Sequence, residues 1–290
     1  MRERINTYYQ LTKPGVLYGN VLTAVAGYFL AATHFSLFQP SIFLGMLVGQ
    51  TLVIGSACVT NNYLDQDIDR LMKRTKKRPS VTGKVSDRNM KRYASVLGIM
   101  GFIILWLLTN PLVVAIGLLG WITYVWLYGA LSKRRSIHGT LVGSISGAMP
   151  IAGGYAAVTG VIDPALVIVF LILFFWQFPE FYSIAIYRRK EYKAAGVPVM
   201  TVVKGNDSTI LQIFIYTVLY VLSTLSLTIL GYTGWIYFVV MLLSGIYWIV
   251  LGAKGFYARD KEVWARTMFR YSMIAILLLC IMLSVGPLLP

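Results

Sequence analysis

One short segment of the chain concentrates side chains that could bind a metal ion and a phosphate group. Asn61, Asp65 and Asp69 follow one another at intervals of four residues. Residues four apart share one face of an α-helix, so these side chains would form a single column of oxygen ligands, from which Asp67 would point away. Such ligands suit Mg²⁺, which takes one or two carboxylates from a protein and completes its shell with water and substrate phosphates. The spacing therefore predicts a site for magnesium and a diphosphate.

A basic stretch directly after these residues supplies the complementary charge. Lys73, Arg74 and Arg78 are predicted to hold the diphosphate oxygens that the metal leaves free. Charged loops between membrane helices often do no more than orient the protein. Orientation, however, depends on Lys and Arg, and acidic residues contribute little to it. The acidic residues therefore favour a binding site.

The composition is that of an integral membrane protein. Of the 290 residues, 57% are hydrophobic and only 13% are charged, whereas about a quarter are charged in a typical globular protein. The net charge of +15 does not indicate a nucleic-acid partner, because the basic residues are confined to short segments between apolar runs. We expect them to orient the chain and to contact anionic lipid and phosphate. Cys58 and Cys280 lie inside apolar runs and are predicted to be packing residues.

Nine apolar runs are long enough to cross a bilayer, which requires about 20 residues each. They predict one transmembrane domain over residues 1–290, with spans at 15–33, 42–64, 93–109, 111–131, 137–159, 165–187, 208–230, 233–253 and 267–289. All 26 Lys and Arg residues precede the first span or follow the second, fourth, sixth and eighth. Nine spans thus place every basic side chain on one side, which predicts an inner-membrane protein with a cytoplasmic N-terminus and an external C-terminus.

This topology brings a second acidic position to the same side. The sixth predicted span ends at a basic segment, Tyr187–Lys193, that contains Glu191. Because the second and sixth spans both end at the cytoplasmic face, we expect Glu191 to be a further metal ligand. Arg188 and Lys193 are predicted to add contacts to the diphosphate.

Glu180 is a candidate of a different kind. It lies eleven residues before Glu191, which on a helix places it about 16 Å deeper in the membrane. An ionisable group at that depth usually faces a cavity or a partner. The alternative is a protonated carboxyl bonded to a neighbouring helix. His34 and His138 are isolated from each other and from other metal-binding residue types in the sequence, so neither is predicted to be a haem ligand.

Three segments resemble the UbiA-type intramembrane prenyltransferases: 61–86, 132–160 and 176–205. The first motif of that superfamily, Asn-x₃-Asp-x₃-Asp, is matched by Asn61, Asp65 and Asp69. The likeness is greatest to the protohaem IX farnesyltransferase branch, which also carries a single carboxylate in the second motif, here Glu191. The opening residues 11–14 and Asn20 are similar too. Glu180 is a departure, because that branch commonly has His there.

The resemblance implies an all-α fold in which nine transmembrane helices surround a central cavity open to lipid. It also implies a Mg²⁺-dependent enzyme that transfers a farnesyl group from farnesyl diphosphate to a vinyl group of haem b, giving haem O and diphosphate. Haem b is then a substrate and not a cofactor. Aromatic rings such as those of Tyr63 and Tyr182 would stabilise the farnesyl cation. Glu180, His138 and Asn20 complete the predicted acceptor side of the cavity.

Two other functions stay open at this point. One is a prenyltransferase of the same fold that acts on an aromatic or quinone precursor. The other is a membrane transporter or lipid-binding protein, in which Asp65, Asp69 and Glu180 would form an ion or substrate path.

Overall fold

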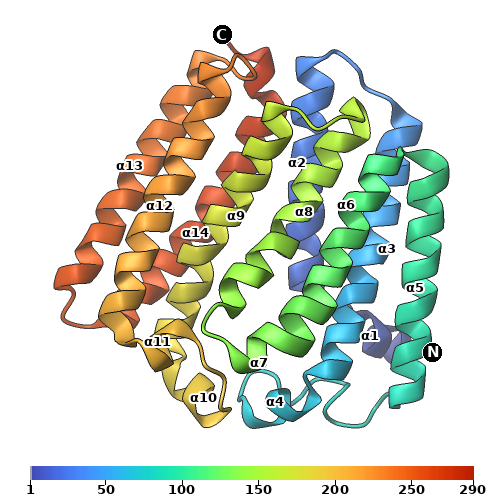
Figure 1. Cartoon of the computed structure of the whole chain (residues 1–290), viewed down its shortest axis with the longest axis vertical. Coiled ribbons are helices and arrows are strands. Elements are labelled where there is room, and N and C mark those ends of the chain that lie inside the picture. The colour runs from blue at the N-terminus through green and yellow to red at the C-terminus, as the bar shows by residue number, and fades with distance from the viewer. Residues whose placement is uncertain (1) are drawn as a thin grey trace.

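The computed structural model describes residues 2–290, and this part of the chain contains helices and no strands (Figure 1). Nine helical segments within it are long and apolar enough to cross a membrane. The protein is a multi-pass membrane protein, and the prediction of nine spans is confirmed. The spanning elements are α2 (Pro14–His34), α3 (Pro40–Leu64), α5 (Asp87–Leu108), α6 (Pro111–Ile122) with its continuation to Arg135, α8 (Gly139–Thr159), α9 (Pro164–Tyr187), α12 (Gly205–Ile229), α13 (Trp235–Tyr257) and α14 (Lys261–Val285).

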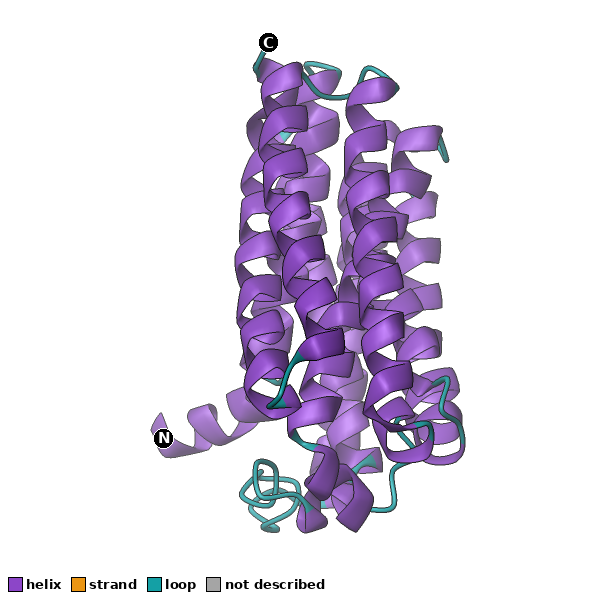
Figure 2. Ribbon diagram, turned by 90° about the vertical axis from the view of Figure 1, so that its left-hand side faces the viewer, coloured by secondary structure: helices purple, strands orange, loops and turns teal. Residues whose placement is uncertain are grey.

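The shorter helices gather at one end of the bundle. They are α1 (Arg2–Leu11), α4 (Gln66–Leu71), α7 (Lys133–Arg135), α10 (Arg189–Ala194) and α11 (Met200–Val203). Figures 1 and 2 show the C-terminus at the opposite end and α1 extending sideways from the bundle. The segments that carry Lys and Arg join the spans at the end with the short helices, which is called the polar end below.

Two spans begin earlier than their apolar runs because polar residues cap them. Helices α5 and α14 start at Asp87 and Lys261, whereas the apolar runs predicted starts at 93 and 267. The Ser86 hydroxyl accepts a hydrogen bond from the amide of Asn89, and the Asp260 carboxylate accepts from two amides in the first turn of α14. Such caps satisfy amides that a helix start leaves free, so the helices continue into the polar end.

Four helices form the centre of the bundle. Helix α2 packs against α8 and α14, and α9 packs against the same two helices. Helices α3, α5 and α6 lie on one side of these four, and α12 and α13 on the other (Figure 1). The centre is closed tightly between α2 and α8, where a Cβ atom on Gly154 would collide with the Ala24 carbonyl and one on Gly27 with the Ile151 carbonyl. Small residues allow this close approach of membrane helices.

Replacing Gly154 by Ala should therefore destabilise the bundle. The added methyl group meets backbone that cannot move alone, and overpacking of this kind costs about 1–3 kcal/mol. Gly117→Ala is the matched control, because its Cβ would make ordinary contacts at 3.5 Å with Leu105 and Phe102. Thermal unfolding in detergent should show a lower midpoint for Gly154→Ala only. Equal midpoints for the two variants would contradict this packing.

Candidate active site

The predicted metal-binding residues lie where α3 ends at the polar end. Asn61 belongs to α3, Asp69 to α4, and Asp65 forms the junction with φ −92° and ψ 4°. Helix α3 ends at Leu64, where the second predicted span ends, so the column crosses a break between two helices. The spacing survives, because the amide of Asp65 donates to the Asn61 carbonyl at 2.9 Å and the amide of Asp69 donates to the Asp65 carbonyl at 2.8 Å. All three side chains are buried, with exposures of 1%, 1% and 3%.

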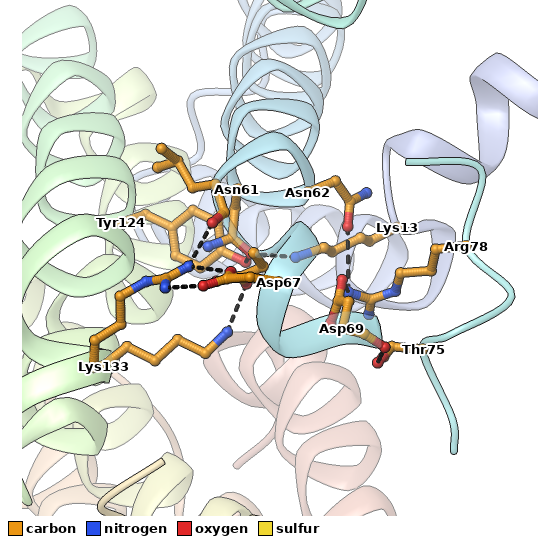
Figure 3. A network of polar contacts seen from close by, with 12 residues as sticks. Lys13, Asn61, Asn62, Asp67, Asp69, Thr75, Arg78, Tyr124 and Lys133 are labelled. Carbon is orange, nitrogen blue, oxygen red and sulfur yellow. Dashed lines mark hydrogen bonds and ion pairs between the residues drawn. The ribbon is translucent and has the colours of Figure 1, made fainter. Parts of the chain in front are cut away.

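Each of these polar side chains contacts a cationic group (Figure 3). The Lys133 ammonium donates to Asp65 Oδ2 at 2.5 Å, and the Arg78 guanidinium donates to Asp69 Oδ2 at 2.6 Å. The Lys13 ammonium donates to Asn61 Oδ1. Burying a carboxylate without a counter-charge costs several kcal/mol, so these cations make the burial possible.

Asp67 points away from the buried ligands, as expected. Its side chain is 65% exposed and accepts two hydrogen bonds from Arg134, at 2.5 and 2.7 Å. These bonds lower the pKa of Asp67 to about 2. The pair joins α4 to the end of the fourth span, and leaves Asp65 and Asp69 as the inward-facing carboxylates.

Lys13 reaches the site through an unusual backbone conformation. Its φ of 52° and ψ of 69° lie in the left-handed region, directly before Pro14 opens α2. Residues other than glycine rarely adopt this region, and such strain is concentrated at functional sites. Burial lowers the pKa of Lys13 to about 8, against the attraction of Asp65. Lys13 thus remains mostly charged near neutral pH.

The fourth span contributes aromatic side chains from a π-helical segment, Thr123–Ser132. The Tyr124 hydroxyl donates to Asn61 Oδ1 at 3.5 Å, and its ring stacks on Tyr128 with 5.8 Å between centroids. Gly129 lies against the Asn61 amide, so the segment packs closely on α3. π-helical turns are rare and occur frequently at functional sites.

The second acidic segment packs beside the first. Ile68 and Met72, in and after α4, form a small buried cluster with Val197, on which Tyr192 and Val199 also pack. Glu191 accepts from Arg188 at 3.0 Å at the start of α10.

Arg74 connects the two segments electrostatically. Burial, followed by the charge of Arg78, lowers the pKa of Arg74, and Arg188, Tyr192 and Asp69 also act on it. The apolar contacts of Ile68 and Met72 with Val197 show that the two segments meet at this end, as predicted.

The two acidic segments each contain a free oxygen atom of the type that a hard divalent cation prefers. Asp65 Oδ1 and Glu191 Oε2 are buried and accept no hydrogen bond within the part of the chain that the structure describes. Residues 2–290 contain no group of three His, Cys, Asp or Glu side chains placed to hold a metal by themselves. Mg²⁺ needs only one or two protein carboxylates when a diphosphate completes its shell. The donor set suits that arrangement better than a metal held by protein alone.

Comparison with known proteins places the chain in a family. The profile of the UbiA prenyltransferase family matches residues 20–274. The chain belongs to this family. It is 44% identical over 283 residues to a protein named protoheme IX farnesyltransferase from Salmonella typhimurium, covering 98% of this chain and 95% of that one.

Solved structures agree with the fold. The structure of a digeranylgeranylglyceryl phosphate synthase superposes with a TM-score of 0.82 at 20% identity, covering 98% of this chain and 99% of that one. A UbiA homologue from Archaeoglobus fulgidus, bound to DMAPP and Mg²⁺, gives 0.72 at 15% identity, covering 96% and 99%. The all-α fold predicted from the sequence is confirmed, and the chain is a UbiA-family prenyltransferase.

Several predicted positions of this UbiA-family prenyltransferase lie apart from the buried carboxylates. Lys73, Lys193 and His138 are exposed at the polar end. Tyr63 packs beside α5, where the Lys91 ammonium lies 4.6 Å from its ring centroid. The structure therefore does not bring Tyr63 to the ligand column.

The deeper candidates are placed within the bundle. Tyr182 is buried against Phe178 in the main core. The Asn20 amide donates to the Val16 carbonyl of its own helix at 2.8 Å. Glu180 is half-buried in α9, and no described side chain forms a hydrogen bond with it.

Sequence reasoning did not assign Lys13, Tyr124 or Lys133 to this site. The position of Lys13 could have indicated a role in the site, because it is a cation directly before the first apolar run. Lys133 belongs to a basic turn that a topology signal explains equally well. Nothing in the sequence indicates that Tyr124 reaches the site, because its position depends on the π-helical segment.

Arg78→Met should destabilise the unliganded enzyme, because Asp69 would remain buried without its guanidinium. Breaking a buried pair costs roughly 3–5 kcal/mol, and partial exposure of Arg78, 21%, reduces this to about 1–3 kcal/mol. Arg70→Met is the control, since Arg70 is exposed and pairs with no described acid. Thermal unfolding in the absence of metal should show a lower midpoint for Arg78→Met than for Arg70→Met. A wild-type midpoint for Arg78→Met would show that this ion pair contributes nothing.

Proposed function

We propose that this protein transfers a farnesyl group from farnesyl diphosphate to a vinyl group of haem b, with addition of water, giving haem O and diphosphate. The observation that carries the proposal is the 44% identity, over nearly the whole of both chains, to a protein named protoheme IX farnesyltransferase. The buried acidic and basic side chains at the polar end support it, because they suit a metal-bound diphosphate.

The chemistry assigns a part to each side chain. Asn61, Asp65, Asp69 and Glu191 would hold Mg²⁺, which neutralises charge on the leaving diphosphate. The structure of a UbiA homologue from Archaeoglobus fulgidus is bound to DMAPP and Mg²⁺, which supports a role for Mg²⁺ in this reaction.

The basic side chains bind the diphosphate itself. Lys133 and Arg78 form ion pairs with Asp65 and Asp69, so their side chains are close enough to donate hydrogen bonds to diphosphate oxygens. Arg74 and Arg188 are proposed as further donors. Fixed donors aimed at developing negative charge favour loss of the diphosphate. Lys73 and Lys193 are proposed as outer contacts, because both are exposed at this end.

The acceptor would approach from the membrane side. The vinyl carbon of haem attacks the allylic carbon of the farnesyl group as the carbon–oxygen bond to diphosphate breaks. Water then adds to the resulting cation and releases a proton. Glu180, Tyr182 and Asn20 are the proposed residues on this side, since they lie on α9 and α2 of the central four helices.

The proposed orientation places the polar end in the cytoplasm of a cell with an inner membrane. All Lys and Arg residues lie in the segments at that end or in the adjoining turns, and positive charge is retained on the cytoplasmic side. Farnesyl diphosphate would enter from the cytoplasmic face, with its apolar chain in the bundle.

Asp65→Asn and Asp69→Asn should each reduce haem O formation by at least about a hundredfold, because each removes charge from the metal site. Asp67→Asn is the matched control, since Asp67 is exposed and faces Arg134. Membranes containing each variant are incubated with haem b, farnesyl diphosphate and Mg²⁺, and the extracted haem is analysed by mass spectrometry.

The same assay separates the alternatives. Retained activity in both Asp65→Asn and Asp69→Asn would refute the metal site. Farnesylation of a quinone precursor without change in haem would identify the other type of prenyltransferase. Absence of Mg²⁺-dependent diphosphate release with every acceptor would refute farnesyl diphosphate as the prenyl donor.

A further inference from the structure

The protein alone has an excess of positive charge around the predicted metal site. Four acidic side chains lie in this cluster: Asp65, Asp67, Asp69 and Glu191. Five cationic side chains contact it: Lys13, Arg78, Lys133, Arg134 and Arg188. A divalent cation bound here by itself would increase an excess that is already positive.

The cations also occupy one oxygen on each of Asn61, Asp65 and Asp69. Lys133 donates to Asp65, Arg78 to Asp69 and Lys13 to Asn61. Lys133 must leave Asp65 Oδ2 before both oxygens of that carboxylate can bind a metal. The Lys133 side chain is only 18% exposed, so its ammonium would lose a buried partner without gaining water freely. Separating a buried charge from its partner is costly.

A diphosphate removes both obstacles. Its oxygens accept hydrogen bonds from the same ammonium and guanidinium groups, and its negative charge offsets the excess.

We propose that Lys13, Lys133 and Arg78 hold the carboxylate and amide oxygens until a diphosphate arrives, then transfer their hydrogen bonds to it. Metal and diphosphate consequently bind with strong positive coupling. This inference rests on the proposed function and adds the order in which that site is filled.

The test measures binding and does not require turnover. The purified full chain in detergent is titrated with Mg²⁺ by calorimetry, with and without inorganic diphosphate. A titration without protein corrects for the complex that the two form in solution. Diphosphate should tighten Mg²⁺ binding at least about tenfold, within the usual range for coupled sites. Mg²⁺ must tighten diphosphate binding by the same factor, because coupling is reciprocal.

Lys133→Met identifies the residue responsible. Without its ammonium, Asp65 is free, so Mg²⁺ alone should bind more tightly and the coupling should fall below about threefold. Lys13→Met should reduce the coupling in the same direction, which provides a second test if Lys133→Met does not fold. Lys254→Met is the control, because Lys254 is exposed in the last turn of α13 and pairs with no described acid.

The outcomes separate this inference from the proposed function. Tight binding of Mg²⁺ alone, unchanged by diphosphate, would overturn the inference, as would full coupling in both Lys133→Met and Lys13→Met. Failure to bind either ligand would overturn it too. An enzyme that makes haem O without coupling contradicts only the inference. Coupling in a protein that does not convert haem b contradicts only the proposed acceptor.

Discussion

Charge compensation of buried carboxylates is the constraint on which the polar end depends. Asp65 and Asp69 are almost inaccessible, and an ionised carboxylate removed from water requires a charged partner of good geometry. The partners come from different parts of the chain: Lys133 from the end of the fourth span, and Arg78 from the loop after α4. These ion pairs hold the end of the fourth span and the loop after α4 against the end of α3.

The nine spans give this cluster its position. Close packing of α2 on α8, through Gly27 and Gly154, fixes the start of α2 and therefore Lys13. The π-helical segment turns Tyr124 and Lys133 toward α3. Contacts among Ile68, Val197 and neighbouring apolar side chains bring α10 to α4. The site is thus assembled by helices that are distant in sequence and held by apolar packing.

Much of this arrangement could be predicted from the sequence, because hydropathy and the distribution of Lys and Arg are strong signals in membrane proteins. They gave all nine spans and placed Asp65 and Glu191 at the same end. The four-residue spacing also predicted that Asp65 and Asp69 lie together and that Asp67 points outward.

The remaining features depend on tertiary contacts. The helix break at Asp65 has no proline or glycine beside it, and the single glycine of the π-helical segment, Gly129, does not distinguish that segment from an ordinary α-helix. The partner of each carboxylate is equally hidden, since a lysine that pairs with Asp65 has the same sequence signal as one that only orients the chain. Glu180 was selected only by its predicted depth in the membrane, and that depth does not specify which residues it contacts.

If Asp65 and Asp69 hold a divalent cation, that cation should lie in direct contact with the diphosphate. Mn²⁺ can replace Mg²⁺ in the purified protein with inorganic diphosphate, and electron–nuclear double resonance then detects phosphorus bonded through oxygen to the metal. The wild-type protein should show a strong ³¹P coupling that is lost in Asp65→Asn and in Asp69→Asn. An unchanged coupling in both variants would contradict it.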